Sequence, residues 1–174
     1  MATDRHVVFS HGKESGPWGS KITALAETAR SEGYAVESID YQGIDSPAQR
    51  IEKLVESCQG LRGDLVLVGS SLGGYVSLAA AALLHARALF LMAPAIYLDG
   101  LPPLRTRAVD CPTAIVHGWR DAVVPVEHSI RFAREHAAAL HVVDDDHRLQ
   151  NSIREIRYLF EYFLIAIDLP PPLS

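Results

Sequence analysis

A serine framed by glycines carries the strongest chemical signal in this sequence. Residues 69–74 read Gly-Ser-Ser-Leu-Gly-Gly, which fits the pattern G-x-S-x-G with Ser71 at its centre. The segment lies between an expected buried strand at 64–69 and an expected helix at 73–84. Such glycines permit a sharp strand-to-helix turn that holds a serine hydroxyl at a helix N-terminus, where developing negative charge is stabilised. The pattern predicts a nucleophile, and the alternative is a glycine-rich turn that only packs helix against sheet.

A nucleophilic serine needs a base, and the base needs an acid that fixes its tautomer. These partners are expected after later strands, in the order serine, acid, histidine. Asp121 follows an expected strand at 113–117, and His147 follows one at 140–143. We therefore predict a triad of Ser71, Asp121 and His147, with Asp99 as the main alternative acid.

The remaining histidines and acids have structural interpretations. Of the eight histidines, His117 is expected to be a structural hydrogen-bonding residue. His11 is expected to order the loop beside the nucleophile. The acidic run at 144–146 is expected to be a solvated turn.

A reacting acyl group also needs two backbone N–H donors for its oxyanion. The N–H of Leu72, directly after the nucleophile, is one candidate. The N–H of Lys13 is the other, because Gly12 lets the loop at 11–19 approach a substrate closely. Candidate pocket residues come from the loops at strand ends: His11, Glu14, Trp18, Tyr41, Ile96 and Tyr97.

The elements that must position these residues alternate between short apolar runs and segments of helical period. Strands are expected at 7–10, 35–40, 64–69, 87–92, 113–117 and 140–143, and helices at 20–33, 46–58, 73–84, 125–136 and 151–167. This alternation predicts an α/β fold with a parallel sheet and helices on both faces. We expect a single domain over 1–174, with a frayed tail at 169–174.

Composition narrows the function classes. The net charge is −5 and the basic residues are scattered, which argues against a nucleic-acid-binding protein. No apolar run reaches membrane-spanning length and no secretory signal is expected, so the sequence predicts a cytoplasmic protein without a membrane partner. Cys58 and Cys111 lack metal-ligand spacing and are expected to be reduced structural thiols.

The ordered motifs resemble those of the α/β-hydrolase superfamily over nearly the full length. The elbow at 69–75 is similar to that of small bacterial esterases, and the acid segment at 117–121 to that of dienelactone-hydrolase-like proteins. The resemblance implies a three-layer sandwich of about six mostly parallel strands in the order 2-1-3-4-5-6. It is a minimal core, because the superfamily has eight strands. The segment at 95–110 is too short for a lid domain, which implies an open site.

The resemblance and the triad together predict hydrolysis of an ester or thioester through an acyl-enzyme at Ser71. A small-molecule acyl substrate is expected, with no metal or organic cofactor. The alternatives are a non-catalytic binding scaffold, and a peptidase or C–C bond hydrolase with the same triad. A minimal core can also expose apolar edges that favour a homodimer.

Overall fold

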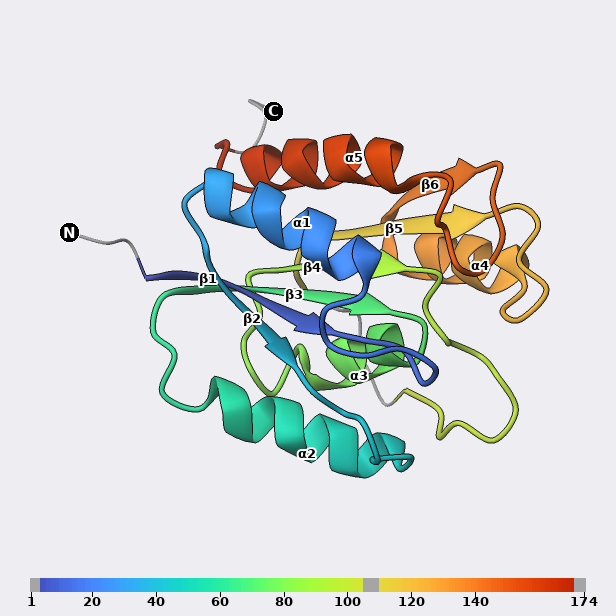
Figure 1. Cartoon of the computed structure of the whole chain (residues 1–174), viewed down its shortest axis with the longest axis horizontal. Helices are drawn as coiled ribbons and strands as arrows, with labels where there is room; N and C mark the ends of the chain where they lie inside the picture. Colours follow the sequence, from blue (N-terminus) through green and yellow to red (C-terminus); the bar gives the residue numbers. More distant parts are fainter. Residues whose placement is uncertain (1–3, 105–109, 171–174) are drawn as a thin grey trace.

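The computed structural model describes residues 4–104 and 110–170, and Figure 1 shows how its elements are arranged. Along the chain they are β1 (Arg5–Ser10), α1 (Ser20–Ser31), β2 (Ala35–Ile39), α2 (Pro47–Cys58), β3 (Asp64–Ser70), α3 (Leu72–Ala80), β4 (Ala88–Met92), β5 (Thr113–Gly118), α4 (Val126–His136), β6 (Ala139–Val143) and α5 (Ile153–Ala166). The strands form one sheet in the order β2-β1-β3-β4-β5-β6, and every neighbouring pair is parallel. The predicted fold class and strand order are confirmed.

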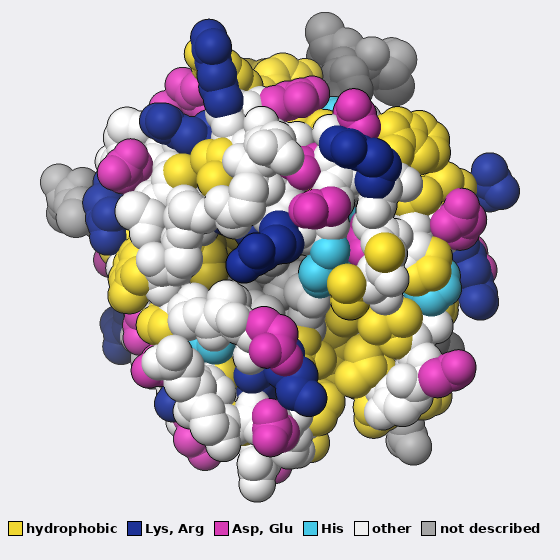
Figure 2. Space-filling model, turned by 45° about the vertical axis from the view of Figure 1, so that its right-hand side comes forward, with side chains coloured by type: hydrophobic (Ala, Val, Ile, Leu, Met, Phe, Trp, Pro, Cys, Tyr) yellow, Lys and Arg dark blue, Asp and Glu magenta, His cyan; other side chains and the backbone are white. Residues whose placement is uncertain are grey.

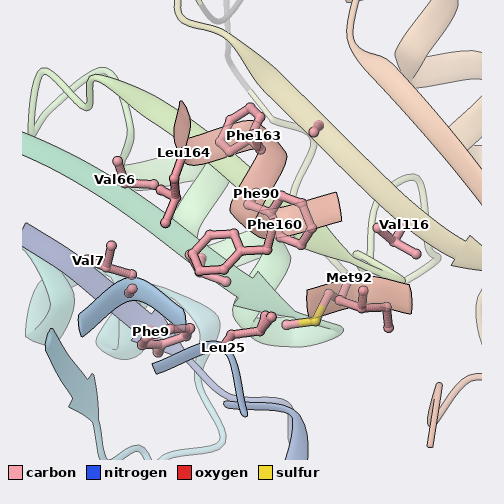
Figure 3. Packing of buried hydrophobic residues seen from close by; sticks show 14 of the residues in the cluster. Val7, Phe9, Leu25, Val66, Phe90, Met92, Val116, Phe160, Phe163 and Leu164 are labelled. Carbon is pink, nitrogen blue, oxygen red and sulfur yellow. The ribbon is translucent and has the colours of Figure 1, made fainter. Parts of the chain in front are cut away.

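The central strands of the sheet are buried on both faces, and their side chains alternate between two cores. Phe9, Val68 and Phe90 point to the face covered by α1 and α5, where the ring of Phe160 packs 4.9 Å from that of Phe90 (Figure 3). Leu67, together with Val8 and Leu89 beside it on the adjacent strands, points to the other face. The helices α2, α3 and α4 cover that face (Figure 1). Covering helices on both faces explain why the central strands read as continuous apolar runs.

Two element boundaries differ from the sequence expectation. The helix α3 ends at Ala80 rather than near residue 84, because the chain turns there through His85, whose φ is +50°, to reach β4. The strand β1 begins earlier than expected, at Arg5, which lies opposite Asp64 of β3.

The chain outside the sheet bears on four other expectations. The connection between β4 and β5 contains no helix in its described parts, 93–104 and 110–112. The expected frayed tail falls mostly on 171–174, outside the described residues. Both cysteines are free thiols. Within the described ranges, every helix is too short or too polar to cross a bilayer.

The nucleophile turn depends on a close approach of α3 to β1 at Gly73. A Cβ atom at this position would lie 2.0 Å from the backbone oxygen of Ser10. We expect Gly73→Ala to lower the free energy of unfolding by about 3 kcal/mol or more, because the backbone of α3 and that of Ser10 and His11 would have to move apart. Urea unfolding followed by circular dichroism measures the change.

Gly19→Ala is the matched control, since a Cβ there meets no atom within 4 Å. Gly19 precedes α1, so its replacement is expected to change the free energy of unfolding by less than about 1 kcal/mol. Equal stability of the two variants would contradict the packing argument.

Candidate active site

Ser71 occupies the turn between β3 and α3 in a strained backbone conformation, with φ +53° and ψ −119°. The neighbouring strand holds it there: the Ser71 N–H donates to the Met92 carbonyl at 3.0 Å, and the Ala95 N–H donates to the Ser71 carbonyl at 2.9 Å. A Cβ at Gly69 would lie 2.3 Å from the Gly73 oxygen, so glycine is required two residues before the serine. The strain is therefore imposed by the surrounding packing, and it presents the hydroxyl at the N-terminus of α3.

Ser71, His147 and Asp121 form one hydrogen-bonded chain. The Ser71 Oγ lies 2.9 Å from His147 Nε2, and His147 Nδ1 lies 2.7 Å from Asp121 Oδ2. Because the carboxylate only accepts, Nδ1 carries the imidazole proton and Nε2 is free to accept the hydroxyl proton. The His147 side chain is 19% exposed, whereas that of Asp121 is fully buried. The three residues predicted as a triad are thus brought together in the geometry that proton transfer needs.

The Asp121 carboxylate accepts four hydrogen bonds. The N–H groups of Val123 and Val124 donate to Oδ1, each at 2.8 Å. His147 and His117 donate to Oδ2. Burial raises the pKa of Asp121, but the hydrogen bonds from His147, Val124 and Val123 together outweigh it, so the pKa lies below its ordinary value. The carboxylate is ionised at neutral pH and fixed in orientation.

The acid loop after β5 and the base loop after β6 are bonded to each other. The Trp119 N–H donates to the Val143 carbonyl at 2.9 Å, and the Arg120 N–H donates to the Asp145 carbonyl at 3.0 Å. A Cβ at Gly118 would lie 2.3 Å from that same Asp145 oxygen. Glycine before the acid segment therefore lets the two loops touch, which sets the separation of Asp121 and His147.

Asp145 corrects the expectation of a solvated turn at 144–146. Its side chain is fully buried, and it accepts hydrogen bonds from the Asp146 N–H at 2.8 Å and from the Ser152 hydroxyl at 2.9 Å. These bonds tie the base loop to the start of α5. Three adjacent aspartates suggest a solvated run by composition, but the middle one is an internal acceptor.

His117 is a second histidine in contact with the acid. It is fully buried, its Nδ1 lies 2.7 Å from the Ser129 hydroxyl, and its Nε2 lies 2.9 Å from the Val124 carbonyl and 3.0 Å from Asp121. The carbonyl only accepts, so Nε2 carries the proton and Nδ1 accepts from Ser129. The sequence indicated a structural hydrogen-bonding residue here but not its contact with Asp121.

We expect His117 to make stability depend on pH. Burial lowers the pKa of His117 in the folded protein below the ordinary 6.5. As pH falls below about 6.5, the unfolded chain binds a proton that the folded protein does not, so the free energy of unfolding decreases until pH passes the folded-state pKa. Urea unfolding between pH 8 and pH 5 should show a shallower decrease for His117→Gln than for the wild type. Identical pH dependences would contradict this assignment.

The loop after β1 lies against the nucleophile. A Cβ at Gly12 would lie 3.4 Å from the Ser71 Cβ. Among the described residues, neither the Lys13 N–H nor the Leu72 N–H has a hydrogen-bond acceptor. His11 orders this loop: it donates to the Gly12 carbonyl at 2.7 Å and accepts from the Tyr41 N–H at 2.8 Å.

The predicted pocket residues divide into three groups. His11, Tyr41 and Ile96 are at most 1% exposed, so they lie beneath the site and do not line an accessible pocket. Tyr97 is half-exposed, but its hydroxyl donates to Glu135 of α4 at 2.7 Å. Glu14 and Trp18 remain exposed in the loop after β1. The burial of His11, Tyr41 and Ile96 corrects the pocket expectation for these three residues. For Tyr97, Glu14 and Trp18 it stays a prediction.

Other residues near the triad were not predicted. Trp119 and Val123, on either side of Asp121, are exposed apolar side chains at 59% and 62%. Lys21 lies in the first turn of α1, and burial lowers its pKa to about 8 against the attraction of Asp145 and Asp121. The carboxyl edge of the sheet is turned forward in Figure 2, where charged and histidine side chains surround a hollow.

Asp99, the alternative acid, is exposed and has no hydrogen bond to a histidine among the described residues.

Comparison with known proteins agrees with this architecture. A family model described as the alpha/beta hydrolase family matches residues 7–172. The chain belongs to the alpha/beta hydrolase family. This alpha/beta hydrolase is 34% identical to a protein of the alpha/beta hydrolase superfamily from Xanthomonas campestris pv. campestris. The match covers 94% of this chain and 99% of the other, with a TM-score of 0.86.

Two further solved structures share the fold of this alpha/beta hydrolase. Est1E from Butyrivibrio proteoclasticus is 19% identical, over 96% of this chain and 89% of its own, with a TM-score of 0.80. A serine hydrolase without a lid from Xanthomonas campestris is 18% identical, over 98% and 86%, with a TM-score of 0.76. Among curated proteins, none matches this chain.

Proposed function

We propose that this protein is a serine hydrolase that cleaves a carboxylic ester or thioester through an acyl-enzyme at Ser71. The observation that carries the proposal is the continuous chain from the Ser71 Oγ through His147 to Asp121, with distances of 2.9 and 2.7 Å. An ionised, fully buried acid and a half-buried base next to a strained serine support it, because this arrangement raises the nucleophilicity of a hydroxyl. The chemistry requires no metal or organic cofactor.

In the acylation step, the Ser71 Oγ attacks the carbonyl carbon while its proton passes to His147 Nε2. The carbonyl oxygen becomes an oxyanion, and we assign its donors as the N–H groups of Leu72 and Lys13. When the tetrahedral intermediate collapses, the bond to the leaving oxygen or sulfur breaks, and His147 returns the proton to the leaving alcohol or thiol. Asp121 stays ionised and holds the imidazolium.

In the deacylation step, water takes the place of the leaving group. His147 accepts a proton from the water, which attacks the acyl carbon, and the proton then returns to Ser71 as the carboxylic acid leaves. The exposed side chains of Trp18, Trp119 and Val123 favour an apolar acyl or aryl group held at an open surface. Est1E, which shares the fold, has been observed with ferulic acid bound, so an ester of an aromatic carboxylic acid belongs among the substrates to test.

The test compares hydrolysis by the wild type and by Ser71→Ala. The substrates are p-nitrophenyl esters from acetate to decanoate, a phenyl thioester and methyl ferulate. The proposal expects turnover of at least one ester that depends on Ser71, and a mass increase equal to the acyl group in acid-quenched wild-type protein. Hydrolysis that is equal in the two proteins, or absent for every substrate, would overturn it. Amide and C–C substrates assayed in parallel identify a different bond specificity.

A further inference from the structure

Arg50 is a buried cation beneath the loop that carries the Lys13 N–H. It lies in the first turns of α2 and is 2% exposed. Its Nε–H donates to the Ile44 carbonyl at 2.7 Å, and its Nη1–H groups face the carbonyls of His11 and Gly12, each at 3.3 Å. Among the described residues, no carboxylate oxygen lies within 4.0 Å of the guanidinium.

Burial of the Arg50 cation without an ion pair costs free energy of folding. The same face of α2 buries Leu54 and Cys58, and an apolar side chain at position 50 would avoid the desolvation of a charge. The ring of Tyr41, whose centroid lies 5.2 Å from the guanidinium carbon, offsets only part of that cost. The resting protein therefore holds a positive charge here that Asp45 attracts from a distance, but that forms no ion pair within 4.0 Å among the described side chains.

One of the three carbonyls that Arg50 contacts belongs to the peptide group that carries the Lys13 N–H. The Gly12 carbonyl accepts from both His11 Nδ1 and Arg50 Nη1. That carbonyl and the Lys13 N–H belong to the same planar trans peptide, so they point in opposite directions. Donors that draw electron density toward the carbonyl oxygen make the N–H at the other end a stronger donor.

We propose that Arg50 is a positioning residue of the oxyanion hole. Its cation orients and polarises the Gly12–Lys13 peptide, so that the Lys13 N–H stabilises the negative charge that forms on the substrate carbonyl oxygen. The negative charge on the substrate oxygen arises only in the transition state, where its stabilisation accelerates the reaction. This inference rests on the proposed acyl transfer at Ser71.

The experiment compares Arg50→Gln, which keeps N–H donors without the charge, with Arg50→Lys, which keeps the charge. Arg62→Gln is the control, because it removes an exposed cation from the turn before β3. The rate of acylation is measured by stopped flow with a p-nitrophenyl ester. The inhibition constant is measured for a trifluoromethyl ketone, whose adduct with serine carries an oxyanion. Thermal unfolding shows that each variant is folded at the assay temperature.

We expect Arg50→Gln to lower the acylation rate about 30-fold with KM nearly unchanged, a smaller effect than loss of a whole oxyanion donor. The affinity for the trifluoromethyl ketone should fall by a similar factor, and Arg50→Lys should recover a substantial part of both losses. Arg62→Gln should match the wild type. If Arg50→Gln does not fold, Arg50→Lys decides alone: a loss in kcat and in ketone affinity at constant KM is expected.

Other outcomes overturn the inference. The first is an unchanged acylation rate in the folded variants. The second is an increase in KM as large as the decrease in the acylation rate. The third is an acylation rate of Arg50→Lys that is no higher than that of Arg50→Gln. Each of these requires that the wild type hydrolyses the ester through Ser71. Wild-type protein that is inactive, or whose activity persists in Ser71→Ala, contradicts the proposed function itself.

Discussion

Ser71→Ala is expected to lower kcat for ester hydrolysis by about 10⁶-fold, because removal of the nucleophile from a triad leaves only binding and oxyanion stabilisation. Steady-state assays with the best ester of the substrate series measure the loss. The free energy of unfolding should change by less than about 1 kcal/mol, since the hydroxyl has one hydrogen bond and sits at the surface of the turn. A large loss of activity with unchanged stability separates a chemical role from a structural one.

Ser70→Ala is the matched control for the nucleophile. Ser70 is the adjacent serine at the end of β3 and is 8% exposed. Its hydroxyl has no contact with His147 among the described residues, so the variant should keep activity within a few-fold of the wild type. Loss of activity in Ser70→Ala with retention in Ser71→Ala would contradict the assignment.

Asp121→Asn is expected to lower kcat by about 10⁴-fold. If the asparagine oxygen keeps the bonds from the Val123 and Val124 N–H groups, its NH₂ faces His147 and His117. The N–H groups of His147 and His117 would then both face the asparagine NH₂, which is itself a donor and cannot accept their hydrogen bonds. His147 can relieve this conflict by moving its proton to Nε2, but that nitrogen can then no longer accept the Ser71 proton.

Steady-state kinetics of Asp121→Asn, with circular dichroism as the check of folding, measure this effect. Asp99→Asn is the control, because Asp99 is the alternative acid and lies exposed after β4. It should retain the wild-type rate. A strong loss in Asp99→Asn together with activity within tenfold of the wild type in Asp121→Asn would contradict the triad as assigned.

The sheet and the triad geometry could be predicted from local signals. Apolar runs separated by helical segments determine a parallel sheet, and parallel strands bring their carboxyl ends to one edge. Residues that follow β3, β5 and β6 therefore converge although they are distant in sequence. This is why Ser71, Asp121 and His147 could be selected from many serines, aspartates and histidines without knowledge of any distance.

The buried polar residues could not be predicted in the same way. Arg50 and Asp145 have residue types that are ordinarily exposed, and each is buried because tertiary contacts satisfy its hydrogen bonds. For His117 the sequence indicated a structural hydrogen-bonding residue, but not that it contacts Asp121. One signal did point to Arg50: it precedes Leu54 by four residues and Cys58 by eight, which places it on the buried face of α2. Arginine is ordinarily exposed, so residue type and helical period indicate opposite positions for this side chain.

The pocket was harder to predict, because position after a strand does not determine side-chain direction. Tyr41 and Ile96 follow β2 and β4 at the correct edge, yet both side chains turn into the core. Successive side chains near a strand end alternate in direction, so a difference of one residue separates a pocket wall from the core. Trp119 and Val123, on the acid loop, are exposed instead.

Labelling with a fluorophosphonate probe tests the central claim most directly, since the probe reacts with an activated serine and requires no knowledge of the substrate. We predict one adduct per folded wild-type molecule, located by peptide mass spectrometry at Ser71, and none in Ser71→Ala or in denatured protein. Absence of labelling in the folded wild type, or equal labelling of Ser71→Ala, would contradict it.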